Sequence, residues 1–255
     1  MYDVYEIRKQ FPMLSGKMMQ NKPLVFLDNS STTFKPQCVI DEMNKYYTEM
    51  NSNSHRGDYD LCYNMDLEVE RTRETISNFV QCEPNEVVFV SGDTMGINLI
   101  AWGYGIKYLT SDDEILITEA EHASNVLPWY KVSEMNGTKV NFIPLTEDGR
   151  LTPENLRKVI SNKTKLVSIA HVGNVLGFAA DVKELAKICH EFGAILVVDG
   201  AQSVPHIKTD FKDWNIDFLV FSAHKMCGPT GIGCVIGKYD LLDKMDPFLT
   251  GGGMN

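Results

Sequence analysis

The fold of this chain is decided by the stretch Phe218-Leu-Val-Phe-Ser222-Ala-His224-Lys225-Met-Cys-Gly-Pro-Thr-Gly-Ile-Gly233. Its first four residues are apolar and are bounded by polar residues, which is typical of a strand covered on both faces in a parallel sheet. Ser222, His224 and Lys225 follow at the carboxyl end of this strand, where open α/β sheets bind their ligands. A lysine there can be partly desolvated, which leaves a neutral amine able to attack a carbonyl group and form a Schiff base. Because such a pattern taken alone also fits a solvated loop lysine, the rest of the chain has to decide between the two interpretations.

Six further apolar runs of strand length alternate with stretches of helical periodicity. They are Val87–Val90, Ile115–Thr118, Val140–Ile143, Leu166–Ala170, Ile195–Val198 and Cys234–Ile236. This alternation indicates the α/β class, here a seven-stranded, mainly parallel sheet with helices on both faces. The last run follows Phe218–Phe221 through a turn that is too short for a helical crossover, so we expect that strand to be antiparallel.

The other elements are predicted from periodicity and capping residues. Expected helices cover Val39–Tyr47, Asp66–Val80, Met95–Trp102, the residues after Thr152-Pro153, and 182–192. The helix at 182–192 is expected to begin at the cap Asp181, with Glu184 completing a capping box, and to end at Gly193. We expect Leu24–Leu27 to form a small strand and the polar stretch Asn51–Gly57 to form a loop.

The length of 255 residues suffices for one large domain or two small ones. We expect residues 1–23 to form an N-terminal arm and residues 24–255 to form one large domain. The sequence ends in the glycine run Leu249-Thr-Gly-Gly-Gly-Met-Asn255, which we interpret as a hinge whose second half is absent.

Composition excludes several classes of function. A net charge of -10 disfavours nucleic acid and anionic membranes as partners, because both are polyanions. No apolar run approaches the roughly 20 residues that span a bilayer, and no signal-peptide pattern is present. The scattered cysteines show no metal-ligand spacing, so we expect no metal site, mostly buried thiols and a cytoplasmic location. They are Cys38, Cys62, Cys82, Cys189, Cys227 and Cys234.

The sharpest chemical signal is Val197-Val-Asp199-Gly-Ala-Gln202. An acid at the end of a fully apolar strand needs a cationic or hydrogen-bonded partner, because burying an unpaired charge is costly. The protonated ring nitrogen of pyridoxal phosphate is such a partner, and a lysine holds the aldehyde of the same cofactor as an imine. Asp199 and Lys225 together therefore favour a pyridoxal phosphate site.

Three other strand ends offer further candidates. Ser91-Gly-Asp-Thr94 opens a helical stretch, and its free amides and hydroxyl groups can cradle a phosphate group, although a plain helix cap explains the motif equally well. Asp93 is a poor neighbour for a dianion unless it caps the helix from outside. His122 can stack on a planar ligand or be a surface residue, and Asn174 can offer its amide to a ligand or satisfy its own backbone.

At this point the chain resembles a known family. Asp199–Gln202 and Ser222–Gly233 resemble the pyridoxal-phosphate signature of class V aminotransferases, in particular of SUF-type cysteine desulfurases. Motifs in matching order extend through most of the chain: Leu27–Pro36, Ser54–Gly57, Gly96–Leu99, Glu121-His122 through Pro128-Trp129, and Asn174–Gly177. The resemblance implies the large domain of a fold type I pyridoxal-phosphate-dependent transferase.

The resemblance also implies roles for individual residues. Lys225 would be the Schiff-base lysine and proton shuttle, and His122 would stack on the cofactor ring as the second catalytic residue. The other implied contacts are Asp199 with the pyridine nitrogen, Gln202 with the ring hydroxyl, Thr94, Ser222 and His224 with the phosphate, Asn174 on the substrate side, and His55 and Arg56 at the entrance.

The implied activity is removal of sulfur from cysteine, which leaves alanine and an enzyme persulfide and serves iron-sulfur cluster assembly. Family members are homodimers with sites at the subunit interface, and a sulfur-acceptor protein is a possible partner. A selenocysteine lyase, another class V enzyme acting on a small amino acid, and a non-catalytic pyridoxal-phosphate-binding protein remain as alternatives.

Several features depart from the family pattern. Relatives continue into a smaller domain with the persulfide cysteine and a carboxylate-binding arginine; neither can be assigned here, so we expect little or no desulfurase activity from the 255 residues alone. Asp93 stands where many relatives have a hydroxyl residue, and its charge is expected to weaken phosphate binding. Cys227 is expected to be a packed thiol. The glycines of 228–233 allow close turns but do not form a dinucleotide motif.

Overall fold

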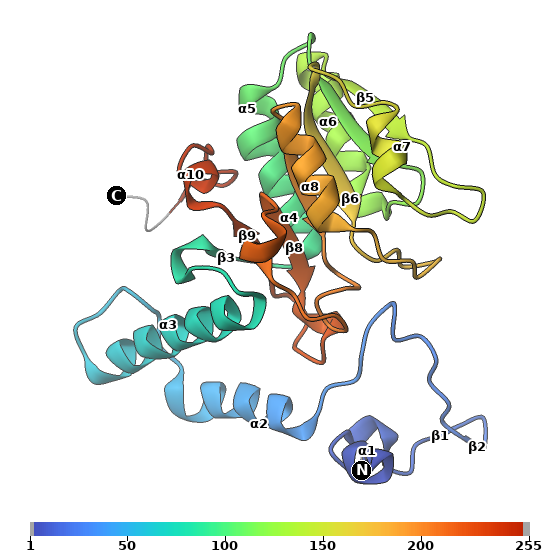
Figure 1. Ribbon diagram of the computed structural model, residues 1–255. Coiled ribbons are helices and arrows are strands. Elements are labelled where there is room, and N and C mark those ends of the chain that lie inside the picture. Colours follow the sequence, from blue (N-terminus) through green and yellow to red (C-terminus); the bar gives the residue numbers. More distant parts are fainter. Residues whose placement is uncertain (1–2, 252–255) are drawn as a thin grey trace.

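Seven strands form one sheet at the centre of the computed structural model, which describes residues 3–251 (Figure 1). The order across the sheet is β3-β9-β8-β7-β6-β4-β5. The strands are β3 (Val87–Val90), β4 (Glu114–Thr118), β5 (Lys139–Ile143), β6 (Thr164–Ala170), β7 (Ile195–Asp199), β8 (Phe218–Ser222) and β9 (Gly233–Gly237). Each coincides with one of the predicted apolar runs, so the predicted α/β class and strand number are confirmed.

The pairing of the strands brings most of their carboxyl ends to one edge. The strands β5, β4, β6, β7 and β8 are parallel to one another. β9 is antiparallel to both β8 and β3. The antiparallel direction predicted for the last strand is confirmed. Because two antiparallel steps restore the original direction, β3 also ends at the same edge as β8.

Helices cover both faces of the sheet (Figure 1). The helices of the described residues are α1 (Val4–Lys9), α2 (Gln37–Lys45), α3 (Asp60–Val80), α4 (Asp93–Ile100), α5 (Ile106–Tyr108), α6 (Leu127–Asn136), α7 (Pro153–Arg157), α8 (Val182–Glu191), α9 (Phe211–Trp214) and α10 (Tyr239–Leu242). Of these, α8 packs on one face and α4 and α6 pack on the other, whereas α1 and α2 lie apart from the sheet. The predicted helices are present, although α3 begins at Asp60 rather than Asp66 and α4 begins at Asp93. No helix in the described residues is both long and apolar enough to cross a membrane.

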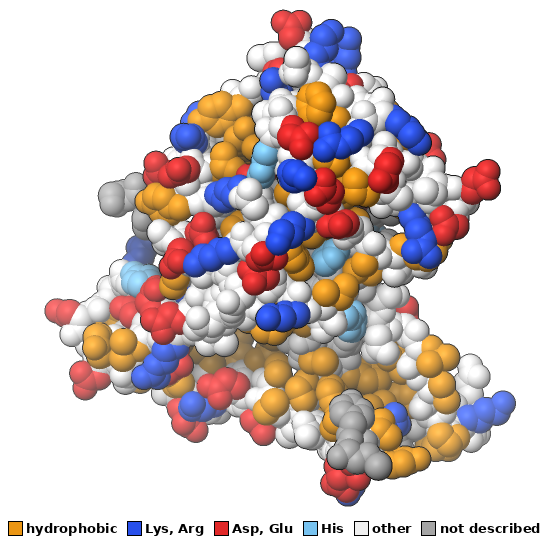
Figure 2. All heavy atoms as spheres, in the orientation of Figure 1, with side chains coloured by type: hydrophobic (Ala, Val, Ile, Leu, Met, Phe, Trp, Pro, Cys, Tyr) orange, Lys and Arg blue, Asp and Glu red, His pale blue; other side chains and the backbone are white. Residues whose placement is uncertain are grey.

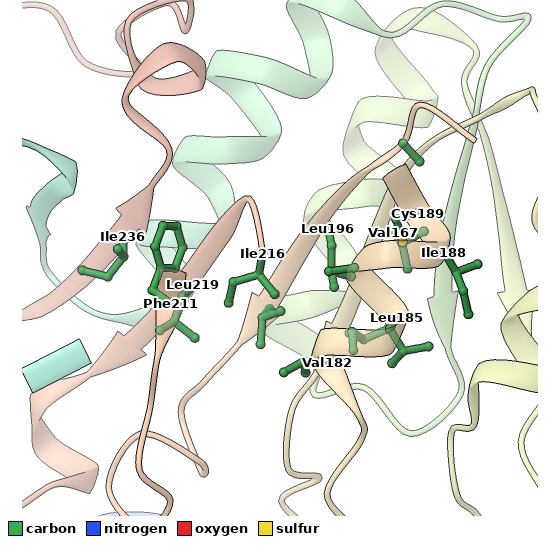
Figure 3. Close-up of a cluster of buried hydrophobic side chains, with 14 of the residues drawn as sticks. Val167, Val182, Leu185, Ile188, Cys189, Leu196, Phe211, Ile216, Leu219 and Ile236 are labelled. Atoms are coloured by element: carbon green, nitrogen blue, oxygen red, sulfur yellow. The ribbon is translucent and has the colours of Figure 1, made fainter. Parts of the chain in front are cut away.

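The two faces of the sheet bury separate apolar cores. On one face, Leu185 and Ile188 of α8 pack with Leu196 of β7 (Figure 3). On the other face, Ile97 of α4 packs in a cluster that includes Val197 of β7. Successive residues of β7 therefore point into opposite cores, which is why residues 195–198 are all apolar.

The ends of α8 follow the predicted capping chemistry in part. The Asp181 side chain accepts a hydrogen bond from the Glu184 amide at 3.1 Å, and Gly193 adopts a φ of 72° just after the helix. The prediction of a capping box is wrong, because the Glu184 carboxylate pairs with Lys187, one helical turn further along. Thr152 caps α7 as predicted.

The prediction of a strand at Leu24–Leu27 is wrong. A strand needs a hydrogen-bonded neighbour, and no strand of the described chain pairs with this segment. Two of its side chains are instead left open to solvent, with Val25 75% and Leu27 90% exposed, whereas Leu24 and Phe26 are half-buried. The short strands β1 (Met18–Met19) and β2 (Lys22–Pro23) lie just before it. Figure 2 shows hydrophobic side chains gathered over the part of the molecule that holds α1, α2 and these strands.

The terminal glycine run falls mostly outside this description. The structure describes Gly251, and the remaining part of the predicted hinge, residues 252–255, lies outside the described residues. The polar stretch Asn51–Gly57 is a loop between α2 and α3, as predicted.

A buried acid joins three elements of the fold at the opposite edge of the sheet. Asp217 Oδ2 accepts hydrogen bonds from the Leu196 amide and from His190 Nε2, both at 2.8 Å. Its Oδ1 accepts a hydrogen bond from Lys238 Nζ at 2.8 Å. Burial alone would raise the pKa of Asp217, but the hydrogen bonds from His190, Lys238 and Leu196 outweigh burial and lower it.

Replacing this acid tests its contribution to stability. We expect Asp217→Asn to lower the free energy of unfolding at neutral pH by about 3 kcal/mol, because it removes the charge that balances Lys238 and His190. The contribution of Asp217 is present above its unfolded pKa, about 3.9, and is lost as the pH falls through the lower folded value. Urea unfolding measures both effects.

The matched control is Asp213→Asn, which removes an exposed ion pair with Lys183. An exposed pair is worth less than about 1 kcal/mol, so this variant should stay close to the parent. Equal losses in the two variants would show that burial of Asp217 does not matter.

Candidate functional site

The carboxyl edge of the sheet borders a cavity of about 370 Å³. This volume is within the range of small-molecule sites, roughly 300–1,000 Å³. All of the side chains predicted as cofactor contacts line it: Thr94, His122, Asn174, Asp199, Gln202, Ser222, His224 and Lys225. They come from the ends of β3, β4, β6, β7 and β8, which the parallel pairing brings together.

The cavity wall also contains residues that sequence reasoning did not select. Ser30 and Ser31 reach it from the N-terminal segment, and Ser124 reaches it from the turn after His122. The run of hydroxyl residues at 30–33 was the available signal for the first two, but a polar turn explains that run equally well. His55 and Arg56, which the resemblance puts at the entrance, are not part of the cavity wall.

Asp199 is held at the bottom of the cavity as predicted for a buried acid. It is 5% exposed, and its Oδ1 accepts a hydrogen bond from the Ala201 amide at 2.9 Å. Burial raises the pKa of Asp199, while the Ala201 amide and the nearby charge of Lys225 act in the opposite direction. The predicted combination of a buried carboxyl group and a lysine in one site is therefore present.

Asp93 does not cap α4 from outside, so it stays a poor neighbour for a dianion. It is the first residue of the helix, is 8% exposed, and lines the cavity together with Asp199. Its amide donates to Ser222 Oγ at 2.7 Å, and its Oδ2 accepts a hydrogen bond from Ser124 Oγ at 3.3 Å. These contacts hold the side chain inward, where Oδ1 is buried without a hydrogen-bond partner in the described part of the chain.

The glycine-rich turn after Lys225 depends on the absence of side chains. A Cβ atom on Gly233 would lie 2.5 Å from the Phe221 carbonyl oxygen and 2.8 Å from Gly92 Cα. Gly231 has a φ of 81°, which side chains disfavour. The close turns predicted for this segment are confirmed.

His122 is oriented by its own turn. Its Nδ1 accepts a hydrogen bond from the Ser124 amide at 3.2 Å and lies 2.7 Å from Ser124 Oγ. Because Nδ1 accepts this amide, the ring proton of a neutral His122 is assigned to Nε2. Ser124 thereby links His122 to Asp93, since its hydroxyl group also contacts that acid.

A buried polar network supports the His122 turn from below. Glu121 accepts hydrogen bonds from Thr118 Oγ1 at 2.6 Å and from Asn125 Nδ2 at 2.7 Å. Asn125 Oδ1 in turn accepts a hydrogen bond from Trp129 Nε1 at 3.2 Å. Burial raises the pKa of Glu121 to about 7, although the hydrogen bonds from Thr118 and Asn125 oppose this rise.

A distant segment holds the loop that carries Lys225. The His224 carbonyl oxygen accepts hydrogen bonds from the Thr33 amide at 3.0 Å, from Thr33 Oγ1 at 2.9 Å and from Lys35 Nζ at 3.0 Å. Thr33 Oγ1 also accepts a hydrogen bond from the Cys227 amide at 2.8 Å. Residues 30–35, which we call the N-terminal clasp, thus restrain both sides of Lys225.

The cysteines match most of the predicted pattern. Cys62, Cys82, Cys189 and Cys234 are buried, whereas Cys38 is exposed. Cys227 is half-buried and is not part of the cavity wall. No cluster of histidine, cysteine or acidic residues that could hold a metal ion occurs within residues 3–251.

Comparison with known proteins identifies the family. The family model described as Aminotransferase class-V matches residues 25–255. The chain belongs to the class-V aminotransferase family. A protein of Halalkalibacterium halodurans named "Probable cysteine desulfurase" is 45% identical over 253 residues, which are 99% of this chain and 62% of that protein.

Solved structures of class-V aminotransferases confirm the fold. The apo cysteine desulfurase of Thermococcus onnurineus NA1 superposes with a TM-score of 0.91 at 35% identity, covering 99% of this chain and 61% of the other. A cysteine desulfurase of Escherichia coli gives a TM-score of 0.88 at 31% identity, covering 100% of this chain and 62% of the other. The chain thus spans about three fifths of the length of these relatives.

Class-V aminotransferases use pyridoxal phosphate, and the residues present fit that cofactor. The cavity provides a buried acid for a ring nitrogen, a lysine for an aldehyde, and the start of α4 with hydroxyl groups for a phosphate. Asp93 is a second lining acid, at the start of α4, where its charge would oppose a phosphate group, and its Oδ1 has no partner among the described residues.

Removing the clasp hydroxyl should loosen the Lys225 loop. We expect Thr33→Val to lower the free energy of unfolding by about 1–3 kcal/mol, because it leaves the Cys227 amide without its partner. Urea unfolding measures this loss. Thr72→Val is the control, since Thr72 is exposed on α3 and bonds only one turn back to Glu68, and its effect should stay within about 0.5 kcal/mol. An unchanged free energy of unfolding in Thr33→Val would show that the clasp does not stabilise the loop.

The raised pKa of Glu121 predicts a pH-dependent stability. The folded value of about 7 lies above the ordinary 4.5, so the cost of ionising Glu121 in the fold is absent at low pH and grows as the pH rises. Glu121→Gln should therefore be more stable than the parent at about pH 8, by on the order of 1–3 kcal/mol, with the difference shrinking toward about pH 5. Thermal unfolding across this range measures it. Glu119→Gln, which removes an exposed charge nearby, should show no such trend; matching trends in both variants would contradict the assignment to Glu121.

Proposed function

We propose that this chain is the cofactor-binding part of a pyridoxal-phosphate-dependent cysteine desulfurase. The observation that carries this proposal is the meeting of a buried acid, Asp199, and a lysine, Lys225, in one cavity at the ends of adjacent parallel strands. The names of the most similar relatives support cysteine as the substrate. In this proposal residues 1–23 form an arm and residues 24–255 form the cofactor-binding domain.

The proposed roles follow from the positions of the side chains. When bound, the cofactor would supply an electron sink beside the α-carbon of the amino acid. Lys225 would hold the cofactor aldehyde and move a proton at the substrate α-carbon, while Asp199 keeps a proton on the ring nitrogen. His122 would pack on the ring. The remaining proposed contacts are Thr94, Ser222 and His224 with the phosphate, Gln202 with the ring hydroxyl and Asn174 with the substrate.

In the proposed reaction a protein thiolate attacks the sulfur of cysteine and the carbon–sulfur bond breaks. The products are alanine and an enzyme persulfide, so the sulfur passes from substrate to thiol without an external oxidant. Two buried thiols do not fit this role, since burial raises the pKa of Cys82 and of Cys234 to about 12. Cys227 is outside the cavity wall.

We further propose a homodimer that passes sulfur to an acceptor protein. The exposed apolar side chains of Val25 and Leu27 support this proposal, because such side chains are normally covered. A cytoplasmic location and a role in iron-sulfur cluster assembly belong to the same proposal.

The cofactor part of the proposal is tested by covalent labelling. We expect the purified chain to absorb as a lysine-bound cofactor when pyridoxal phosphate is added, and borohydride to fix the label on Lys225, where peptide mass mapping finds it. Lys225→Ala should lose the label while the control Lys208→Ala, at an exposed lysine, keeps it. Labelling of the Lys225→Ala protein equal to the parent would refute the proposal.

The substrate is tested by alanine release. Faster release from cysteine than from selenocysteine supports a desulfurase, and the reverse order supports a selenocysteine lyase. Covalent labelling of Lys225 without alanine from either substrate would leave a pyridoxal-phosphate-binding protein as the function of these 255 residues.

A further inference from the structure

Two acids share the floor of the cavity. Asp93 lies at the start of α4 and Asp199 at the end of β7, and both side chains are more than nine-tenths buried. The cation that faces both of them from the neighbouring loop is Lys225. If both acids were ionised, two negative charges would face one positive charge in a desolvated site.

Hydrogen bonding distinguishes the two acids. Asp199 accepts a backbone amide, which stabilises an ionised carboxylate. Asp93 accepts only a long bond of 3.3 Å from Ser124, and its Oδ1 is buried without a partner in the described chain. An unpaired carboxylate oxygen is costly to bury, whereas a protonated carboxyl group becomes a donor.

The surrounding charges point to the same assignment. Burial raises the pKa of Asp93 well above its ordinary value, and the negative charge of Asp199 raises it further. Lys225 and the Ser124 hydroxyl act in the opposite direction without reversing the shift. Protonation of Asp93 would remove the repulsion between the two carboxyl groups and give its buried Oδ1 side a donor. His122 also faces Asp199 and favours its charged form.

We propose that Asp93 and Asp199 share one proton, held on Asp93, and that this proton allows the cavity to accept a phosphate-bearing ligand. The first part depends on the burial of the two acids in one cavity and on their different hydrogen-bond partners. The second part rests on the proposed function, because it assigns the phosphate group to Ser222 and Thr94, the immediate neighbours of Asp93.

The consequence for binding follows from charge. A neutral Asp93 can donate a hydrogen bond beside the phosphate, whereas an ionised Asp93 repels a dianion in a site with little water to screen it. Affinity for a phosphate-bearing ligand should therefore fall as Asp93 ionises with rising pH. The same ligand without its phosphate should not respond to Asp93 in this way.

The first experiment locates the proton in the protein without cofactor. Because burial also raises the pKa of Glu121 to about 7, parent and variants are compared in the Glu121→Gln background, which removes the band of that acid. In this background the infrared spectrum at neutral pH should contain a carboxylic acid carbonyl band that Asp93→Asn lacks. Asp112→Asn, which removes an exposed acid outside the cavity, should keep the band. A band that survives in Asp93→Asn would overturn the shared proton, and this result does not depend on any cofactor.

The second experiment measures ligand binding from about pH 6 to about pH 9, on either side of ordinary neutral conditions. Parent and Asp93→Asn are titrated with pyridoxal phosphate and with pyridoxal, which has no phosphate. Toward the upper end, the parent should bind pyridoxal phosphate at least about tenfold more weakly than Asp93→Asn, a change of about 1.4 kcal/mol. The two proteins should bind pyridoxal alike.

Each outcome of the titration has a meaning. Identical pH profiles for pyridoxal phosphate, or weaker binding by Asp93→Asn throughout, would overturn the role of the proton in binding. Asp93→Thr supplies a second neutral side chain if Asp93→Asn does not fold. Like Asp93→Asn, it should bind pyridoxal phosphate more tightly than the parent toward high pH. Loss of the Lys225 label with the infrared band intact would count against the proposed function alone.

Discussion

The opposite charges of Asp199 and Lys225, which line one cavity, are the constraint on which the rest of the site depends. Asp199 is the last residue of β7 and Lys225 lies three residues after the end of β8, so two buried strands carry the two groups to the cavity. Parallel pairing of β7 and β8 brings the two strand ends to the same edge. The sheet therefore acts as a rigid support that holds two groups together at a cost that the surrounding cores offset.

The rigidity of this support does not extend to the loop that carries Lys225. That loop is held from outside by the clasp at residues 30–35, through the carbonyl group of His224 and the amide of Cys227. The clasp does not belong to a strand. The exposed apolar residues Val25 and Leu27 come shortly before it in the sequence. The position of Lys225 thus depends in part on hydrogen bonds from a segment that is distant in the sequence.

Charge balance in the cavity links the site to solution conditions. Acids and hydroxyl groups outnumber cations around the cavity, so its ability to receive an anion depends on which acid is neutral. The contacts of Asp93 and Asp199 differ enough to decide this, because a backbone amide satisfies one carboxylate and nothing comparable satisfies the other. A hydroxyl residue in place of Asp93 would remove this dependence.

The sequence by itself determined the strands, the direction of the last one, and most of the cavity wall. Apolar runs such as Val197-Val198 report burial on two faces, and residues at strand ends converge because parallel strands share one edge. Three features were decided only by the tertiary structure. Leu24–Leu27 lacks a strand partner, and the side chain of Asp93 points into the cavity. Thr33 contacts His224, which is 191 residues away in the sequence. Local sequence patterns do not predict such contacts, because these contacts form between distant segments that compete for the same hydrogen-bonding groups.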